Sequence, residues 1–207
     1  MPTPPVAPIL FSSGSVLAFP GTRLLVRDAI IKVHNIVERQ QWGKRTPKYE
    51  NLEKDWDYDS IVIHHSGNRG YKDPKEIERK HMDDNKYDDV GYHYMIHPNG
   101  TIYEGREIIY KGTHVFQVNT GKIGILMMGD YDEQWWDFDD TLSQTHIEKM
   151  KELVKTLRRS FTGIKYFGGH LEFAKAHGDE RTCPGNLLMA KMDELRNEFG
   201  LNAPQKS

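Results

Sequence analysis

The chain has 207 residues, of which 28% are charged and 37% are hydrophobic, and its formal net charge is −2. This length is enough to bury a sizeable core in one domain, and the composition is typical of a globular protein. The charge balance gives no reason to expect a surface that binds polyanions, so we expect no nucleic-acid partner. No apolar run approaches the ~20 residues that cross a bilayer, so we expect no membrane span.

The N-terminal extension, residues 1–36, is Pro-rich at first and then mixed in composition. Its first apolar patch is not preceded by Lys or Arg, because the first basic residue is Arg23, so we read no standard secretory signal. The stretch RLLVRDAIIKVHNIV fits either a short helix or a pair of strands. We expect residues 37–200 to form the main domain and 201–207 a C-terminal tail.

The first clear strand is SIVIHHS, a short β-branched apolar run that stops abruptly at polar residues and Gly. It predicts a buried strand with His64 and His65 at its carboxyl end. The stretch that follows begins a helix, because Asp73 is a good N-cap residue and Pro74 suits the first helical position.

Two further strand patterns follow. VGYHYMIHPNGTIYEGR consists of two alternating runs joined around Asn99-Gly100, residues typical of a type I′ turn, and predicts a β-hairpin. KIGILMMGDY is a continuous apolar run, short enough to be a central strand buried on both faces.

The C-terminal half predicts two helices and one strand. Thr141 and Gln144 fit a capping box at the start of a long helix, and IKYFGGH predicts a strand ending at His170. The last helix follows Pro184-Gly185. Because strands alternate with helices and the hairpin is antiparallel, we expect an α/β fold: a single domain with a central mixed β-sheet flanked by helices. The apolar faces of the two helices are Ile147, Met150, Val154, Leu157 and Phe161, then Leu188, Met192, Leu195 and Phe199.

Cys183 is the single cysteine, so the fold contains no internal disulfide. Two predicted strands end at His64 and His170, and Cys183 lies on the loop after the second. Side chains at the carboxyl ends of strands converge, and two imidazoles with one thiolate match a zinc site that keeps an open position. The spacing by itself is not specific, because a lone cysteine is more often buried filler. The residues alone leave both interpretations open.

Five sequence blocks favour the zinc site over a cysteine that is only buried. They are, in chain order, RQQWGKRTPK, IVIHHS, VGYHYMIHPNGTIYEGR, KGTHVFQVNTGKIGILMMGDY and GGH…RTCPG. They resemble the N-acetylmuramoyl-L-alanine amidase type 2 superfamily, which includes peptidoglycan recognition proteins and phage amidase lysozymes. The resemblance covers about residues 37–199. It implies the α/β fold of that superfamily, with Zn²⁺ bound by His64, His170 and Cys183. The interval before CPG is longer than usual and contains His177, an alternative third ligand. We favour His170 because it directly follows a strand.

The resemblance also implies further site residues. Tyr92 has the position of the catalytic tyrosine, and Arg181 falls where phage amidases carry a catalytic lysine. A guanidinium could stabilise an oxyanion but could not act as a base. His114 matches a histidine that either contacts the substrate or donates a hydrogen bond to a metal ligand. Some relatives have a glutamate base directly after the Gly-Ile pair of the central strand. In this chain Leu126 has that position, which makes Tyr92 the stronger candidate for the catalytic role.

Other histidines and aromatic residues have plainer interpretations. We expect His65, His93 and His97 to be structural or to support metal ligands, and His81 to be a packing residue. Trp135 and Trp136 follow acidic residues and either cover the core or form a groove wall.

The resemblance implies a zinc-dependent N-acetylmuramoyl-L-alanine amidase that cuts between N-acetylmuramic acid and L-alanine of the peptidoglycan stem peptide. The alternatives are a peptidoglycan-binding receptor without catalysis, and a stem-peptide endopeptidase with the same zinc site. We expect a monomer, made in the cytoplasm, that is secreted or delivered to the periplasm of a target cell. Delivery as a phage lysin and as an antibacterial type VI secretion effector with an immunity protein both fit; we favour the effector.

Overall fold

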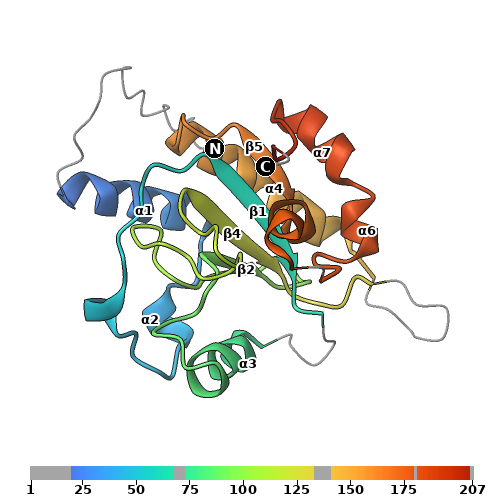
Figure 1. The fold of residues 1–207 in the computed structure, drawn as a ribbon. Helices are drawn as coiled ribbons and strands as arrows, with labels where there is room; N and C mark the ends of the chain where they lie inside the picture. The colour runs from blue at the N-terminus through green and yellow to red at the C-terminus, as the bar shows by residue number, and fades with distance from the viewer. Residues whose placement is uncertain (1–19, 68–72, 133–140, 180, 206–207) are drawn as a thin grey trace, which may run out of the picture.

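The computed structural model describes residues 20–67, 73–132, 141–179 and 181–205. Its centre is a five-stranded sheet with the strand order β3-β2-β4-β1-β5 (Figure 1). The β2–β4, β4–β1 and β1–β5 pairs are parallel, and the β2–β3 pair is antiparallel. This confirms the predicted α/β fold with a mixed sheet. The strands are β1 (Ser60–His65), β2 (Tyr94–Ile96), β3 (Ile102–Glu104), β4 (Lys122–Met127) and β5 (Tyr166–Gly169).

Helices cover both faces of the sheet (Figure 1). Side chains of α1, α4 and α7 form the largest core cluster with one face, whereas α2, α3 and α5 supply the smaller clusters on the other. No helix among the described ranges is both long and apolar enough to span a bilayer. The helices are α1 (Pro20–His34), α2 (Arg39–Trp42), η1 (Tyr49–Asn51), α3 (Pro74–Glu78), the π-helical η2 (Arg79–Asp84), α4 (Gln144–Ser160), α5 (His170–Ala174), η3 (Lys175–His177), α6 (Asn186–Met189) and α7 (Met192–Phe199).

Helix α1 settles the open choice in the N-terminal region, where a helix and a strand pair both fitted the sequence. Ile30 of α1 is buried in the same core cluster as strand residues of the sheet. Arg27 donates two hydrogen bonds to Glu104 of β3, from Nε at 2.6 Å and from Nη2 at 2.5 Å. Both side chains are buried, so this ion pair fixes the helix against the edge strand. The division at residue 36 stays a prediction.

The hairpin between β2 and β3 is confirmed, but its turn is not type I′. Pro98 and Asn99 occupy the two central positions, and the N–H of Gly100 donates to the carbonyl of His97 at 2.8 Å. A type I′ turn requires positive φ at both central residues, which proline cannot adopt. Gly100 is the last residue of the turn and has a φ of 91°, so the glycine belongs to a three-residue loop between His97 and Thr101.

Two helix boundaries also differ from the expectation. The N-cap of α4 is Ser143, whose side chain accepts a hydrogen bond from the His146 N–H, and not Thr141. The C-terminal segment predicted as one helix is divided into α6 and α7 near Lys191. The predicted apolar positions on these helices are nevertheless buried, because the two short helices pack against the same core.

Candidate metal centre

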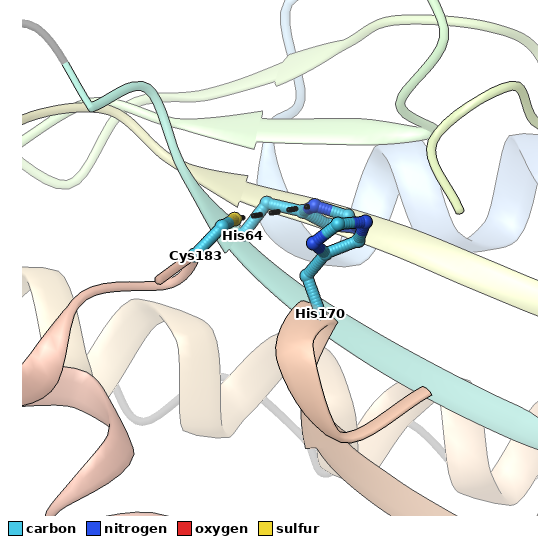
Figure 2. Close-up of side chains that lie close together, drawn as sticks. All are labelled: His64, His170 and Cys183. Carbon is cyan, nitrogen blue, oxygen red and sulfur yellow. Dashed lines mark hydrogen bonds between the residues drawn. The ribbon is translucent and has the colours of Figure 1, made fainter. Parts of the chain in front are cut away.

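Three side chains from separate segments converge at the carboxyl ends of β1 and β5. His64 lies in β1, which is hydrogen-bonded to β4 and β5 on either side. His170 is the first residue of α5, directly after β5, and Cys183 lies in the loop before α6. Figure 2 shows the three side chains directed at one another. The backbone joins the last two segments, because the Leu171 N–H donates to the Cys183 carbonyl at 2.9 Å.

The geometry of this group suits one shared cation. Cys183 Sγ lies 3.6 Å from His64 Nδ1, and the imidazole centroids of His64 and His170 are 4.9 Å apart. One potential ligand atom from each of the three residues lies within 4.8 Å of the other two. Both histidines are buried, at 2% and 1% exposure. Within the described ranges His177 is not part of this group, which favours His170 between the two alternatives.

The ring nitrogens of His170 add an independent observation. Both are buried, and neither has a hydrogen-bond partner among the described residues. Nε2 does lie 3.5 Å from Oδ2 of Asp179, without the geometry of a hydrogen bond. Buried polar atoms are normally satisfied, so a ring of this kind needs a ligand. A cation between His170, His64 and Cys183 would supply one.

A chain of hydrogen bonds fixes the tautomer of His64. The Lys122 carbonyl can only accept, so Nε2–H of His114, 3.2 Å away, must donate to it. His114 Nδ1 therefore accepts from His64 Nε2–H at 3.0 Å. This leaves the lone pair of His64 Nδ1 facing Cys183. Both His114 nitrogens are thereby used within the protein, which favours a supporting role for His114 over direct substrate contact.

Two glycines make room for the His114 ring. A Cβ on Gly124 of β4 would lie 2.7 Å from two ring carbons of His114, and a Cβ on Gly112 would lie 2.5 Å from one. Larger residues at either position would force the imidazole away from His64. The glycine in KIGIL is thus the sequence signal for this supporting histidine.

Burial sets the protonation of the candidate ligands. Desolvation holds the pKa of His64 well below its usual value and lowers the pKa of His170 to about 4, so both rings are neutral near pH 7. Burial raises the pKa of the Cys183 thiol to about 12. A divalent cation reverses that last preference, because a coordinating thiol is deprotonated. Two neutral imidazoles and one thiol that can ionise fit zinc.

Tyr92 and Arg181 both lie near this group. The Tyr92 ring is half-buried with its centroid 4.9 Å from that of His64, and burial raises its pKa, so the hydroxyl keeps its proton. Arg181 is exposed and donates to Asp179 through Nε at 2.8 Å and through Nη2. That contact is the main reason that the pKa of Asp179 falls to about 2.

A second cluster beside the first consists of His65, Asp130 and Asp132. The Tyr131 N–H donates to His65 Nδ1 at 3.2 Å, so neutral His65 carries its proton on Nε2 and keeps no lone pair for a cation. The cluster instead fixes the loop before Cys183, because the Thr182 hydroxyl donates to Asp132 at 2.7 Å.

The remaining predicted positions have structural contacts where they are described. His93 accepts from the Gly124 N–H and lies within hydrogen-bonding distance of the Tyr110 carbonyl, each at 3.0 Å. His81 and His97 accept backbone N–H groups of nearby loops. Trp135 and Trp136 lie outside the described residues.

Asp179 lies beside His170 and is not among the site residues that the sequence predicts. It lies in the longer interval between His170 and Cys183, where the sequence drew attention to His177 instead. An acidic residue two positions before an arginine is common on protein surfaces, so the sequence around Asp179 does not indicate a role in the site. Its position beside His170 depends on how the interval folds back.

The fold and this group define the class: an α/β protein with a candidate metal centre of two histidines and one cysteine. The chain belongs to the N-acetylmuramoyl-L-alanine amidase family, whose sequence model matches residues 54–186, more than half of the chain. The resemblance seen in the five sequence blocks is therefore confirmed.

Individual relatives are similar over most of the chain. Peptidoglycan-recognition protein SC2 of Drosophila simulans is 26% identical over 171 residues, which cover 80% of this chain and 88% of that protein. The endolysin of Escherichia phage T7 is 28% identical over 120 residues, 57% of this chain and 78% of that protein. The solved N-acetylmuramoyl-L-alanine amidase LysC from Clostridium intestinale URNW has a TM-score of 0.65 at 23% identity, covering 81% and 98%, and shows the same fold.

Proposed function

We propose that this protein is a zinc-dependent N-acetylmuramoyl-L-alanine amidase, which hydrolyses the amide between N-acetylmuramic acid and L-alanine of the stem peptide. The observation that carries the proposal is the convergence of His64, His170 and Cys183, with Tyr92 beside them. Family membership supports either a peptidoglycan amidase or a peptidoglycan-binding protein. The retained ligand set favours the amidase, because binding alone needs no metal ligands.

The three candidate ligands would hold the zinc ion, which supplies Lewis acidity toward a carbonyl oxygen and toward water. The chain's own residues prepare the site for this. His114 holds His64 in the tautomer that presents Nδ1. The protonated hydroxyl of Tyr92 can donate a hydrogen bond to the oxygen that becomes negative when the amide is attacked. The guanidinium of Arg181 adds positive charge at the rim of the site.

Identifying the bond that the protein cuts tests the proposal directly. Purified peptidoglycan sacculi are digested with the zinc-loaded protein, and the fragments are analysed by mass spectrometry. The expected product is intact glycan strands with free L-alanine amino termini on the released peptides. New reducing sugars would contradict the proposal, and cleavage elsewhere in the peptide would indicate the endopeptidase.

Two variants separate catalysis from binding. Tyr92→Phe is expected to retain zinc and peptidoglycan binding while losing turnover by about 10²–10³-fold, the range for loss of one oxyanion donor. Cys183→Ala is expected to lose zinc and activity together. If the wild-type protein binds sacculi but releases no fragments when it carries one equivalent of zinc, it is a receptor.

We also propose, on the activity above, that the protein reaches peptidoglycan as an interbacterial effector neutralised by an immunity protein. Expression with and without a periplasmic targeting sequence tests the access step. If only the form with the targeting sequence lyses cells, the protein in the cytoplasm has no access to peptidoglycan and must be delivered to it. Lysis by both forms would contradict this.

A further inference from the structure

We propose that Asp179 is the positioning residue for His170: its carboxylate faces Nε2 of the imidazole and favours the tautomer with the proton on that nitrogen, and Arg181 holds the carboxylate in place. The inference rests on the metal site of the proposed function and extends it to the interval between His170 and Cys183. It also assigns Arg181 a role through Asp179, in addition to any effect of its charge.

The contact between the imidazole and the carboxylate carries the first step. Asp179 Oδ2 lies 3.5 Å from His170 Nε2, a close electrostatic contact without the geometry of a hydrogen bond, and the Asp179 side chain is 10% exposed. A carboxylate can only accept, so the neutral ring facing it presents Nε2–H. The lone pair is then on Nδ1, the nitrogen left free for a cation. The second unsatisfied atom of His170 is this same Nδ1.

The second step is the restraint on the carboxylate itself. Oδ1 of Asp179 accepts from Arg181 Nε at 2.8 Å and from the Arg181 backbone N–H at 3.2 Å, while Oδ2 accepts from Nη2. A two-pronged contact of this type fixes the plane of the carboxylate as well as its position. The Arg181 side chain is 69% exposed and the Asp179 side chain is 10% exposed, so the arginine binds the carboxylate from the solvent side.

The third step is the equivalence of the two histidine ligands. His64 presents Nδ1 because its Nε2–H is held by His114, and His170 presents Nδ1 because its Nε2–H faces Asp179. Metal-binding histidines commonly donate their second N–H to such a partner, and loss of the partner typically costs about 10–100-fold in metal affinity. Asp179 supplies for His170 what His114 supplies for His64.

The test compares Asp179→Ala with a matched control in the full chain. Asp83→Ala is the control, because Asp83 is also bound by an arginine through Nε and Nη2, at Arg45, and is not part of the metal group. Zinc affinity is measured by competition with a chromophoric chelator. We expect about 10–100-fold weaker zinc binding for Asp179→Ala and an unchanged value for Asp83→Ala. Thermal melts verify that both variants fold.

A second readout uses the metal-free protein and needs no activity. The ¹⁵N shifts of the His170 ring report its tautomer: Nε2–H is expected in the wild type and a mixture in Asp179→Ala. An Nδ1–H ring in the wild type, or unchanged zinc affinity in the variant, would overturn the inference. Weaker zinc binding without a change of tautomer would also overturn it, because charge alone would then explain the loss. A wild-type protein that binds zinc and cuts nothing refutes the proposed function but leaves this inference intact.

Discussion

Substituting Gly124 by alanine should disable the metal centre without touching a ligand. The added Cβ would lie 2.7 Å from two carbons of the His114 ring, whereas ordinary contact begins at 3.4 Å. The ring must therefore move by about 0.7 Å, unless the strand moves instead. The His64–His114 hydrogen bond is 3.0 Å long and the His114–Lys122 hydrogen bond is 3.2 Å long. A displacement of the ring that lengthens these distances by about 0.7 Å breaks both hydrogen bonds.

Two magnitudes follow from that displacement. Overpacking of a filled interior costs about 1–3 kcal/mol of unfolding free energy. Loss of the partner that orients a metal-binding histidine costs about 10–100-fold in zinc affinity. Urea unfolding measures the first, and chelator competition measures the second.

A double-mutant cycle separates this mechanism from a general disturbance of β4. The three nearest atoms to the added Cβ all belong to His114, so Gly124→Ala should cost little once His114 is alanine. His114→Ala alone should weaken zinc binding, and the double variant should weaken it no further. If Gly124→Ala has the same effect in both backgrounds, the steric argument is refuted.

Three further predictions address stability, pH and metal removal. Arg27→Ala should lower the unfolding free energy by about 3–5 kcal/mol, because it leaves the carboxylate of Glu104 buried without its positively charged partner; an unchanged urea midpoint would contradict this. Burial lowers the pKa of His81 and of His93 to about 4, so the folded protein binds fewer protons than the unfolded chain between about pH 6.5 and 4. Stability should therefore fall as the pH drops through this window, by up to about 1.4 kcal/mol per pH unit for each histidine, and urea midpoints at pH 7 and pH 5 measure the difference. Chelation should lower the melting temperature of the zinc-loaded wild type but not that of Cys183→Ala, since only the first loses a ligand bound to its folded state.

The sheet could be predicted from the sequence because its signals are local. The apolar runs around Ile63 and Ile125 are buried on both faces, and each run is short and bounded by polar residues. The two alternating runs also predict the hairpin, but the type I′ turn predicted from Asn99-Gly100 is wrong. Asn99-Gly100 suits a two-residue loop, and Pro98 before it moves the turn one position toward the N-terminus.

The site was only partly predictable, for a different reason. His64 and His170 could be located because each follows from a strand pattern, and strand ends meet at one edge. Asp179 could not, because its contact with His170 depends on the path of an irregular interval. The sequence does not decide the role of His114, because its two hydrogen bonds connect His64 of β1 with Lys122 at the start of β4, and only the pairing of those strands brings them together.

The packing around Gly169 explains how the Cys183 loop reaches His170. A Cβ on Gly169 would lie 2.5 Å from Pro184 Cδ and 2.5 Å from Met189 Sδ, so only glycine lets the C-terminal segment approach the end of β5 this closely. The Leu171–Cys183 backbone hydrogen bond then forms beside this contact. His170 and Cys183 are thus positioned by one local unit, whereas His64 is positioned by the β1–β5 pairing. A substitution that disturbs either contact separates the ligands while leaving each ligand's own side chain in place.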